Sequence, residues 1–277
     1  MRRYHEPMTQ PAGWPKLLTQ TGRTAQHWLT EWWQLVNLGA VIMVLMLSPS
    51  SYSRQSRALM ARHIYLSTAP ILLGFSLLCA LVTVVLTRIV VVTALSYGLS
   101  QYALQVVIRV LVLELIPLTA ALFVALRCTI PDGVELTAMQ AGGELDAMRR
   151  RGVEPLRTEV LPRVVAGMFS GVTLAALSCV VALGVAYVAV YGFDLAGLAG
   201  YTRLFGQVFN PAVTLIFVLK TLFFCIAVSL IPMASALYGL PGRRGASVRT
   251  SAEMRGLVRM FAVILLMEVA SLVGNYY

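Results

Sequence analysis

The stretch RCTIPDGVELTAMQAGGELDAMRRRGVEPLRTEVLPR (residues 127–163) is the longest charge-dense interval of the sequence. It holds six basic and six acidic residues in 37 positions, so it must lie in water. The runs on either side, LTAALFVAL and VVAGMFSGVTLAALSCVVALGVAYVAV, are apolar. A polar, helix-compatible block between two long apolar runs is typical of a loop on one side of a membrane, with a short helix of its own.

The composition is that of an integral membrane protein. Of the 277 residues, 58% are hydrophobic and only 12% are charged, whereas charged residues make up about a quarter of a soluble domain. The net charge of +10 could indicate nucleic-acid binding, but that requires a basic face on a soluble fold. Instead, 18 of the 22 Lys and Arg residues fall in segments 1–63, 127–163 and 239–259, between or before the apolar runs. This bias predicts that the three segments are cytoplasmic.

The cysteines and the N-terminus add no further chemistry. No pair of cysteines has the spacing of a metal site or a redox motif, so we expect no disulfide and no bound metal. The first apolar run begins too late for a cleavable signal peptide, and we expect none.

The N-terminal segment favours a helix that lies in the plane of the membrane. Its apolar run, 35–47, has 13 residues, whereas a span needs roughly 20. Extending the run backwards adds a polar arc, which favours an amphipathic helix at the interface. All four tryptophans, which concentrate at the headgroup level, precede this run: Trp14, Trp28, Trp32 and Trp33.

Five spans are predicted in the rest of the chain. We therefore expect an all-α membrane protein with a cytoplasmic segment and interfacial helix in 1–63, and a five-span domain in 64–277. A short apolar link, 89–98, joins the first two spans, and Arg88 can snorkel at the far end of the first. The N-terminus is expected in the cytoplasm and the C-terminus outside. The spans are 64–87, 100–126, 164–191, 211–238 and 257–276.

Four charged residues remain inside these spans, and their formal charges sum to zero: Arg109, Glu114, Lys220 and Glu268. An unpaired charge costs at least ~2.5 kcal/mol at the bilayer centre, so the four should face the bundle interior and pair. Counted from the outer helix ends at 1.5 Å per residue, Glu114 comes to about 21 Å and the other three to roughly 12–14 Å. Two interpretations stay open: structural ion pairs, or the lining of a cavity through which an amphiphilic substrate passes.

The middle of the polar block predicts a short amphipathic helix. The run 134–148 is helical in character but interrupted by Gly142 and Gly143, and 149–152 supplies a basic last turn with a glycine stop. Leu145 and Met148 are apolar residues with charged flanks, which can insert into a groove of another protein. A helix on the lipid headgroups, or a solvated connector, is the alternative.

The same block resembles a known family. The pattern ELxxM, the ending LDAM and the run RRGVEPLRxxVLPRVVAG resemble the signature of MlaE-type permeases, the membrane subunits of lipid-moving ABC transporters that work with MCE-domain proteins. The preceding VLELIPLTAALFVALR and the later LKTLFF are similar to the family's segments around an intramembrane glutamate and a lysine. The matched positions are colinear: Glu114, Pro117, Arg127, Glu135, Met139, Pro155, Pro162, Arg163 and Lys220.

The resemblance implies a specific architecture and role. The loop at 127–163 would carry a coupling helix, and its structure would depend on Arg127, Glu135, Pro155, Pro162 and Arg163. The permease would work as a homodimer with two cytoplasmic ATPase subunits. It would exchange phospholipid with a periplasmic MCE protein in the bacterial inner membrane, the setting of outer-membrane lipid asymmetry. The candidate ATPase contacts are Glu144, Leu145, Asp146, Ala147 and Met148.

The chain departs from the family pattern at several positions. Gly142, Gly143 and Glu144 stand where the family has Thr-Glu-Gln. Leu113 replaces the arginine beside the intramembrane glutamate, and Arg109, four residues earlier on that face, is expected to supply the missing charge. Glycines expected near Arg127 are replaced by Leu126 and Thr129.

The preferred functional hypothesis is therefore a lipid ABC permease subunit. No GxxxxGK[ST] phosphate-binding loop occurs in the sequence, so we expect ATP and Mg on a partner ATPase and no cofactor or enzymatic activity in this chain. Arg109, Glu114, Lys220 and Glu268 would line the substrate cavity. The alternatives are a membrane-embedded lipid-modifying enzyme with Glu114 as its base, and a non-transporting assembly factor.

Overall fold

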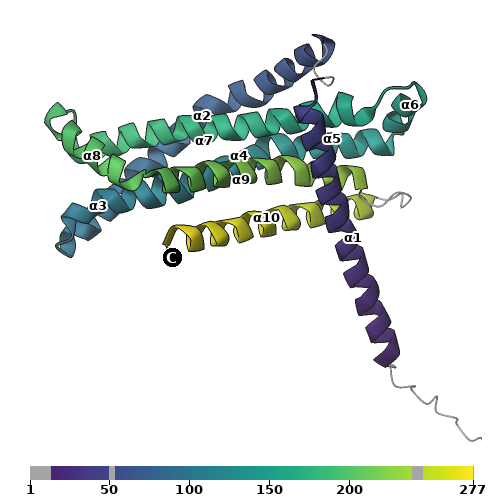
Figure 1. Ribbon diagram of the computed structural model, residues 1–277, viewed down its shortest axis with the longest axis horizontal. Helices are drawn as coiled ribbons and strands as arrows, with labels where there is room; N and C mark the ends of the chain where they lie inside the picture. Colours follow the sequence, from purple (N-terminus) through teal and green to yellow (C-terminus); the bar gives the residue numbers. More distant parts are fainter. Residues whose placement is uncertain (1–13, 50–53, 239–245, 277) are drawn as a thin grey trace, which may run out of the picture.

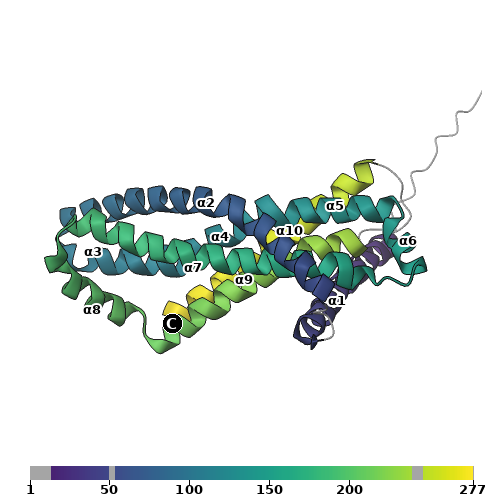
Figure 2. The same cartoon turned by 90° about the horizontal axis from the view of Figure 1, so that it is seen from above.

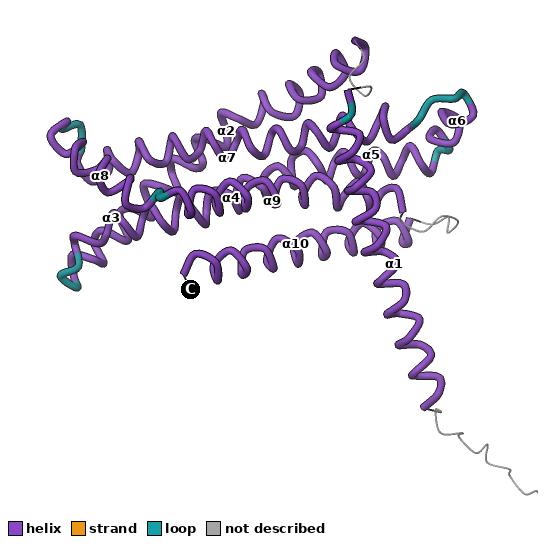
Figure 3. The backbone as a smooth tube through the Cα atoms, viewed as in Figure 1, coloured by secondary structure: helices purple, strands orange, loops and turns teal. Residues whose placement is uncertain are grey.

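The protein is an elongated bundle of long helices. The computed structural model describes residues 14–49, 54–238 and 246–276, and every regular element in these ranges is a helix. The turns between the helices are short (Figure 3). The helices are α1 Trp14–Leu47, α2 Arg54–Ser96, α3 Ser100–Val107, η2 Ile108–Leu115, α4 Ile116–Val124, η3 Ala125–Thr129, α5 Ile130–Ala141, α6 Glu144–Arg150, η4 Leu156–Val160, α7 Leu161–Tyr191, η5 Leu195–Gly197, α8 Leu198–Val208, α9 Pro211–Tyr238 and α10 Ala246–Tyr276.

Six helices in the described ranges are long and apolar enough to cross a membrane. Five of the apolar stretches cover all or nearly all of the predicted spans, and the sixth, Leu29–Leu47, contains the run predicted to lie in the membrane plane. In the bundle α2 packs along α7, α7 packs on α9, and α9 packs on α10 (Figures 1 and 2). The chain is thus an all-helical, multi-pass membrane protein.

Several helices are much longer than a bilayer requires. The apolar stretch of α2, Arg57–Ser96, has 40 residues, which at 1.5 Å per residue extends about 60 Å, twice the ~30 Å hydrocarbon core. The predicted link at 89–98 is therefore wrong in its first part, because α2 remains helical to Ser96 and turns only at Gly98, which has a φ of 70°. Helices α9 and α10 stop short of the α2–α3 and α7–α8 corners (Figure 1). These corners, called here the α8 end, project beyond the rest of the bundle.

The polar block is a helical hairpin rather than a loop. Residues 100–141 form one continuous helical rod. Helix α5, in the polar block, follows directly on the helix of the second predicted span. The rod ends at Ala141, and Gly143, with a φ of 75°, starts α6 in the reverse direction. Such a φ strains any residue with a Cβ, so the predicted interruption of the helix at Gly142–Gly143 is confirmed and has a backbone cause. This hairpin marks the opposite end of the bundle, the α6 end.

Three π-helical turns interrupt the α-helices of the described ranges, and each ends two residues before a proline. Segments η2, η3 and η4 end at positions 115, 129 and 160, and the prolines follow at 117, 131 and 162. A proline inside a helix cannot donate to the carbonyl four residues earlier, and its ring clashes with that carbonyl. Widening the preceding turn to i→i+5 bonding relieves the clash, so the rod continues through its prolines.

Small residues bring α7 and α9 into close contact. A Cβ added at Gly171 would lie 2.5 Å from Sγ of Cys225, and one at Gly167 would lie 2.7 Å from Oγ of Ser229. The two glycines are four residues apart, as are their partners, so they form one stripe on each helix. Gly184, farther along α7, has no such neighbour within 4 Å. The close approach is therefore found in the first half of α7.

Helix α1 crosses the bundle instead of running along it (Figures 1 and 2). Its C-terminal half packs on the α6 end, where Leu38, Ile42 and Leu45 join a buried cluster that includes Leu136 and Met233. An ion pair between Glu31 and Arg259 adds a polar link from α1 to α10. The side chains of residues 14–28, including Trp14 and Trp28, lie outside the described set.

Candidate functional site

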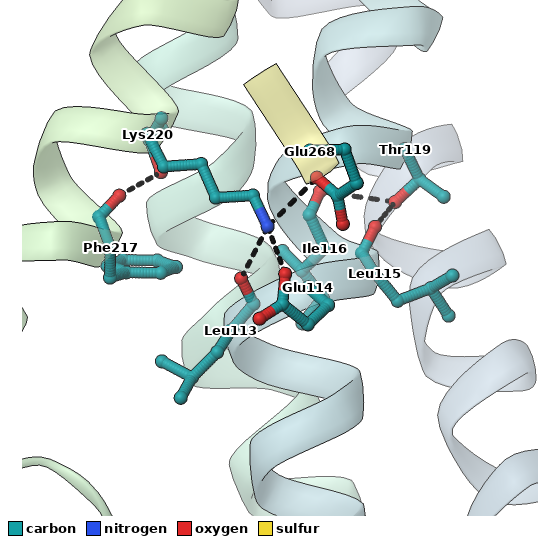
Figure 4. A network of polar contacts seen from close by, with 9 residues as sticks. Leu113, Glu114, Leu115, Ile116, Thr119, Phe217, Lys220 and Glu268 are labelled. Carbon is teal, nitrogen blue, oxygen red and sulfur yellow. Dashed lines mark hydrogen bonds and ion pairs between the residues drawn. The ribbon is translucent and has the colours of Figure 1, made fainter. Parts of the chain in front are cut away.

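Three of the four intramembrane charges meet in the middle of the bundle. Lys220 of α9 lies between Glu114 of η2 and Glu268 of α10 (Figure 4). Its Nζ donates to the carboxylate of Glu114, lies 2.9 Å from Oε2 of Glu268, and donates to the carbonyl of Leu113 at 3.4 Å. These three ionisable residues are called the charge cluster below.

Burial makes the charge cluster energetically important. The Lys220 side chain is 2% exposed, whereas those of Glu114 and Glu268 are 11% and 13% exposed. The ring of Phe224 covers the ammonium at 5.7 Å from its centroid, a distance suited to a cation–π contact. Removing one partner of such a pair would leave an uncompensated buried charge, so the cluster fixes the register of η2, α9 and α10.

The cluster contains one ammonium and two carboxylates, so its formal charge is −1 when all three are ionised. Both carboxylates keep an exposed edge while the ammonium is enclosed. Oε2 of Glu268 makes no hydrogen bond of normal geometry among the described residues, although it lies within ion-pair distance of Lys220. Nearby Thr119 directs its hydroxyl to the carbonyls of Leu115 and Ile116 in its own helix. Oε2 of Glu268 is therefore enclosed in the bundle beside the ammonium of Lys220.

Arg109 does not join the cluster. Its side chain is half-buried, and in the described part of the chain it forms no ion pair within 4 Å. The depth count placed Arg109 level with Lys220 and Glu268, and this was wrong. The count assumed that the second and fourth spans begin at one level, but α3 projects farther out than α9 (Figure 1). Glu114, and not Arg109, therefore lies level with Lys220. Leu113, at the family's arginine position, is buried in an apolar cluster.

A second set of charges holds the polar hairpin to α7. The guanidinium of Arg163 is 4% exposed and contacts Glu159 of η4 at 2.6 Å and Glu135 of α5 at 3.4 Å. Pro155 and Pro162 are also buried, while Arg127 is exposed. The predicted loop residues thus divide into three buried ones, Pro155, Pro162 and Arg163, and two exposed ones, Arg127 and Glu135.

Further polar contacts fasten this region to α9. Thr129, at a position where the family pattern has glycine, donates its hydroxyl to the Val228 carbonyl at 2.7 Å. Gln140 donates its side-chain amide to the Leu237 carbonyl at 3.0 Å. The rod that carries Glu114 is therefore fixed to α9 on both sides of the η3 turn.

The short helix α6 presents a charged face. Glu144 and Asp146 are exposed, Ala147 and Met148 are half-buried, and Leu145 is 3% exposed. Leu145 belongs to the same buried cluster as α1 and α5, so it packs inside the chain and does not project as an apolar knob. The surface that α6 offers to another protein consists mainly of Glu144, Asp146 and the basic residues that follow.

The comparison with protein families agrees with this architecture. The family model described as "Permease MlaE" matches residues 60–273, which is most of the chain.

The chain belongs to the MlaE permease family.

A search of curated proteins finds no match. A member of this family is a membrane subunit of a transporter and not an enzyme, so the alternative of a lipid-modifying enzyme with Glu114 as its base is not retained.

Two features of this MlaE-family permease escaped the sequence reasoning. The π-turns could have been suspected from prolines inside a long helix-compatible run, because each proline demands a local change of hydrogen bonding. The ion pair between Glu31 and Arg259 carried no local signal, since 228 residues separate its members. The packing of α1 across α9, which also packs on α10, brings them together.

Proposed function

We propose that this chain is the permease subunit of an ABC transporter that moves phospholipid between the inner membrane and a periplasmic MCE-domain carrier. Two copies of the permease would enclose the lipid and work with two copies of a cytoplasmic ATPase. Membership of the MlaE family supports the transporter role. The single structural observation that carries the proposal is the α5–α6 hairpin, which places an exposed charged helix at one end of a rod that also carries Glu114.

The hairpin offers a rigid connection between an ATPase and the membrane. Residues 100–141 are continuous helix, and Arg163 clamps α5 to η4 and thereby to α7. A rigid-body movement imposed on α6 would therefore reach the charge cluster without passing through a loop. Closure of the ATPase pair on ATP would change the volume between the two permease copies and expel the lipid.

The charge bias supports an orientation with the α6 end in the cytoplasm and the α8 end in the periplasm. In that orientation α1 would lie in the cytoplasmic membrane interface. Its steep crossing of the bundle supports this position (Figures 1 and 2), as does its apolar face of Leu38, Ile42 and Leu45. The N-terminus would then be cytoplasmic and the C-terminus periplasmic.

Charge reversal on α6 tests the coupling role. Asp146→Lys changes an exposed side chain, so the chain should fold normally, bind the ATPase less tightly and transfer lipid at least about tenfold more slowly. The measurement is ATP-driven transfer of fluorescent phospholipid between vesicles and the purified carrier. Glu154→Lys, another exposed acidic residue, lies outside α6 and is the matched control.

Two outcomes would contradict the proposal. Equal transfer by the Asp146→Lys and wild-type complexes would remove α6 from the coupling path. A chain that assembles with the ATPase but never transfers lipid would favour the non-transporting assembly factor. Leu145→Asp is not a useful test, because Leu145 is buried in this chain and the change would disturb its own packing.

A further inference from the structure

The charge cluster contains more acids than bases. Lys220 is its one cation, whereas Glu114 and Glu268 are both acids. The charged groups that act on Glu268 are Lys220 and Glu114, and Arg109 is not one of them. The nearest other charged residue of α10 is Arg259, nine positions earlier, which is roughly 13 Å along the helix. Within the described part of the chain, no further cation therefore balances the second acid.

The two acids of the cluster are in contact with each other. The side chain of Glu268 is within hydrogen-bonding reach of Glu114 as well as of Lys220. Two ionised carboxylates have only acceptor atoms and cannot form a hydrogen bond, whereas a protonated carboxyl group has one O–H to donate. A nearby like charge also opposes the ionisation of both acids of such a pair. The contact between Glu114 and Glu268 is therefore favourable only when one of them carries a proton.

The position of Lys220 indicates which acid holds this proton. Nζ of Lys220 donates a hydrogen bond to Oε2 of Glu114, and a carboxylate that accepts from an ammonium is stabilised in its ionised form. Nζ also lies 2.9 Å from Oε2 of Glu268, but that oxygen makes no hydrogen bond of normal geometry among the described residues. A neutral carboxyl group can face an ammonium in this way through its carbonyl oxygen. Glu268 is therefore the better site for the proton.

We propose that Glu268 is a proton-binding site: its carboxyl group carries a proton at neutral pH and donates it to the ionised Glu114, which also accepts from Lys220. The cluster then consists of one cation, one anion and one neutral acid, so its formal charge is zero. A neutral cluster needs no counter-ion from lipid or solvent, which suits its place in the middle of an apolar bundle. The Glu268 proton also gives the two acids a hydrogen bond in place of a repulsion.

Infrared spectroscopy of the full-length permease detects this proton directly. A protonated carboxyl group has a carbonyl stretch that is separate from the bands of a carboxylate and shifts when the protein is prepared in D2O. At neutral pH wild type should show this band, and Glu268→Gln should lose it. Asp132→Asn is the control, since Asp132 is a half-buried acid of the same rod outside the cluster, and it should keep the band. A wild-type spectrum without the band, or an unchanged band in Glu268→Gln, would overturn the inference.

A further variant tests the part played by the neighbouring acid. In Glu114→Gln, Glu268 becomes the one acid within ion-pair distance of Lys220 among the described residues, so it should ionise and the band should disappear. A band that persists in Glu114→Gln would show that burial alone protonates Glu268 and would refute the shared proton.

Thermal unfolding gives a second test that uses neither ATP nor lipid transfer, so its outcome is independent of the proposed transport function. Glutamine has the shape of a protonated glutamate and keeps a donor for Glu114, so Glu268→Gln should unfold at the same temperature as wild type. Glu268→Leu lacks the donor and should unfold at a lower temperature. A clear shift of the midpoint in Glu268→Gln, in either direction, would show that Glu268 is ionised in wild type and would overturn the proposal.

Discussion

At the scale of single residues, Lys220 has the most demanding environment. It is nearly fully enclosed and faces two carboxylates. We predict that Lys220→Met destabilises the protein by about 3–5 kcal/mol, because it leaves buried carboxylates without a counter-charge. The measurement is the thermal unfolding midpoint in detergent. The triple variant Lys220→Met, Glu114→Gln, Glu268→Gln should recover most of the loss, and a triple variant as unstable as the single one would contradict the electrostatic explanation.

Glu114 gives a prediction about transport rather than stability. Removing it leaves Lys220 paired one to one with Glu268, so Glu114→Ala should assemble normally with its partners. Lipid transfer should nevertheless be abolished if the cluster faces the lipid cavity. Thr119→Val is the control on the same helix, because the Thr119 hydroxyl bonds only to carbonyls of its own turn. Wild-type transfer by Glu114→Ala would reduce the cluster to a structural ion pair.

The sequence identified the charged residues inside the membrane but did not show which of them form ion pairs. Charges inside apolar runs are rare and costly, so Glu114, Lys220 and Glu268 stood out directly. Their pairing depended on the relative heights of three helices, which the sequence does not state. The count failed for Arg109 because α3 begins farther out than α9. The burial of Leu145 was also missed, because both sides of α6 contain charged residues and only the position of α1 decides which face is covered.

At the scale of elements, the contact between α7 and α9 depends on the absence of side chains. We predict that Gly171→Ala destabilises the protein by about 1–3 kcal/mol, because the new Cβ would lie 2.5 Å from Sγ of Cys225. The double variant Gly171→Ala, Cys225→Ala should regain most of this loss, since it removes the clashing sulfur. Gly184→Ala, in the same helix but with free space around it, should be neutral or slightly stabilising. Thermal unfolding of the four proteins checks the series.

Elements were predicted well where hydrophobicity defined them and less well at their ends. The apolar runs marked the membrane-crossing stretches, and Gly142–Gly143 marked the break between α5 and α6. The polar block was expected to form a loop, but a polar segment continues a helix when its residues favour helix and one face stays covered. Leu136 of α5 is completely buried against the α6-end cluster and provides that cover. This long-range contact has no trace in the local pattern.

At the scale of the whole molecule, the orientation of α1 decides how many times the chain crosses the membrane. Length and composition allow Leu29–Leu47 to span, but its crossing of the bundle favours the membrane plane. We predict that spin labels at Val36 and Val44, both exposed, report nearly equal depth in the bilayer. Labels at Val258 and Leu266 of α10, also eight residues apart and exposed, should differ by about 12 Å. The measurement is nitroxide accessibility to oxygen and a water-soluble relaxant, in a chain whose native cysteines are replaced.

A depth difference of similar size in both label pairs would contradict the in-plane position and make α1 a sixth span. The charge bias offers an independent constraint, since a sixth span would move the arginines at the N-terminus to the other side of the membrane. The sequence thus predicted the class of the molecule, and the sidedness of its segments stays a prediction. It could not predict the projecting α8 end, because apolar composition does not reveal where the bilayer stops along a helix twice its thickness.

The three π-turns allow the winding of the long helical rod to change. A π-turn holds one residue more than an α-turn of the same helix, so closing one would rotate everything beyond it by about 100° and shift it by about 1.5 Å. Segment η3 lies between Glu114 and the α5–α6 hairpin, and η2 contains Glu114 itself. A change of winding at η3 would therefore turn α6 relative to Glu114 with little change in the rod's length. A rotation of α6 would therefore change the direction in which the Glu114 carboxylate points relative to the hairpin.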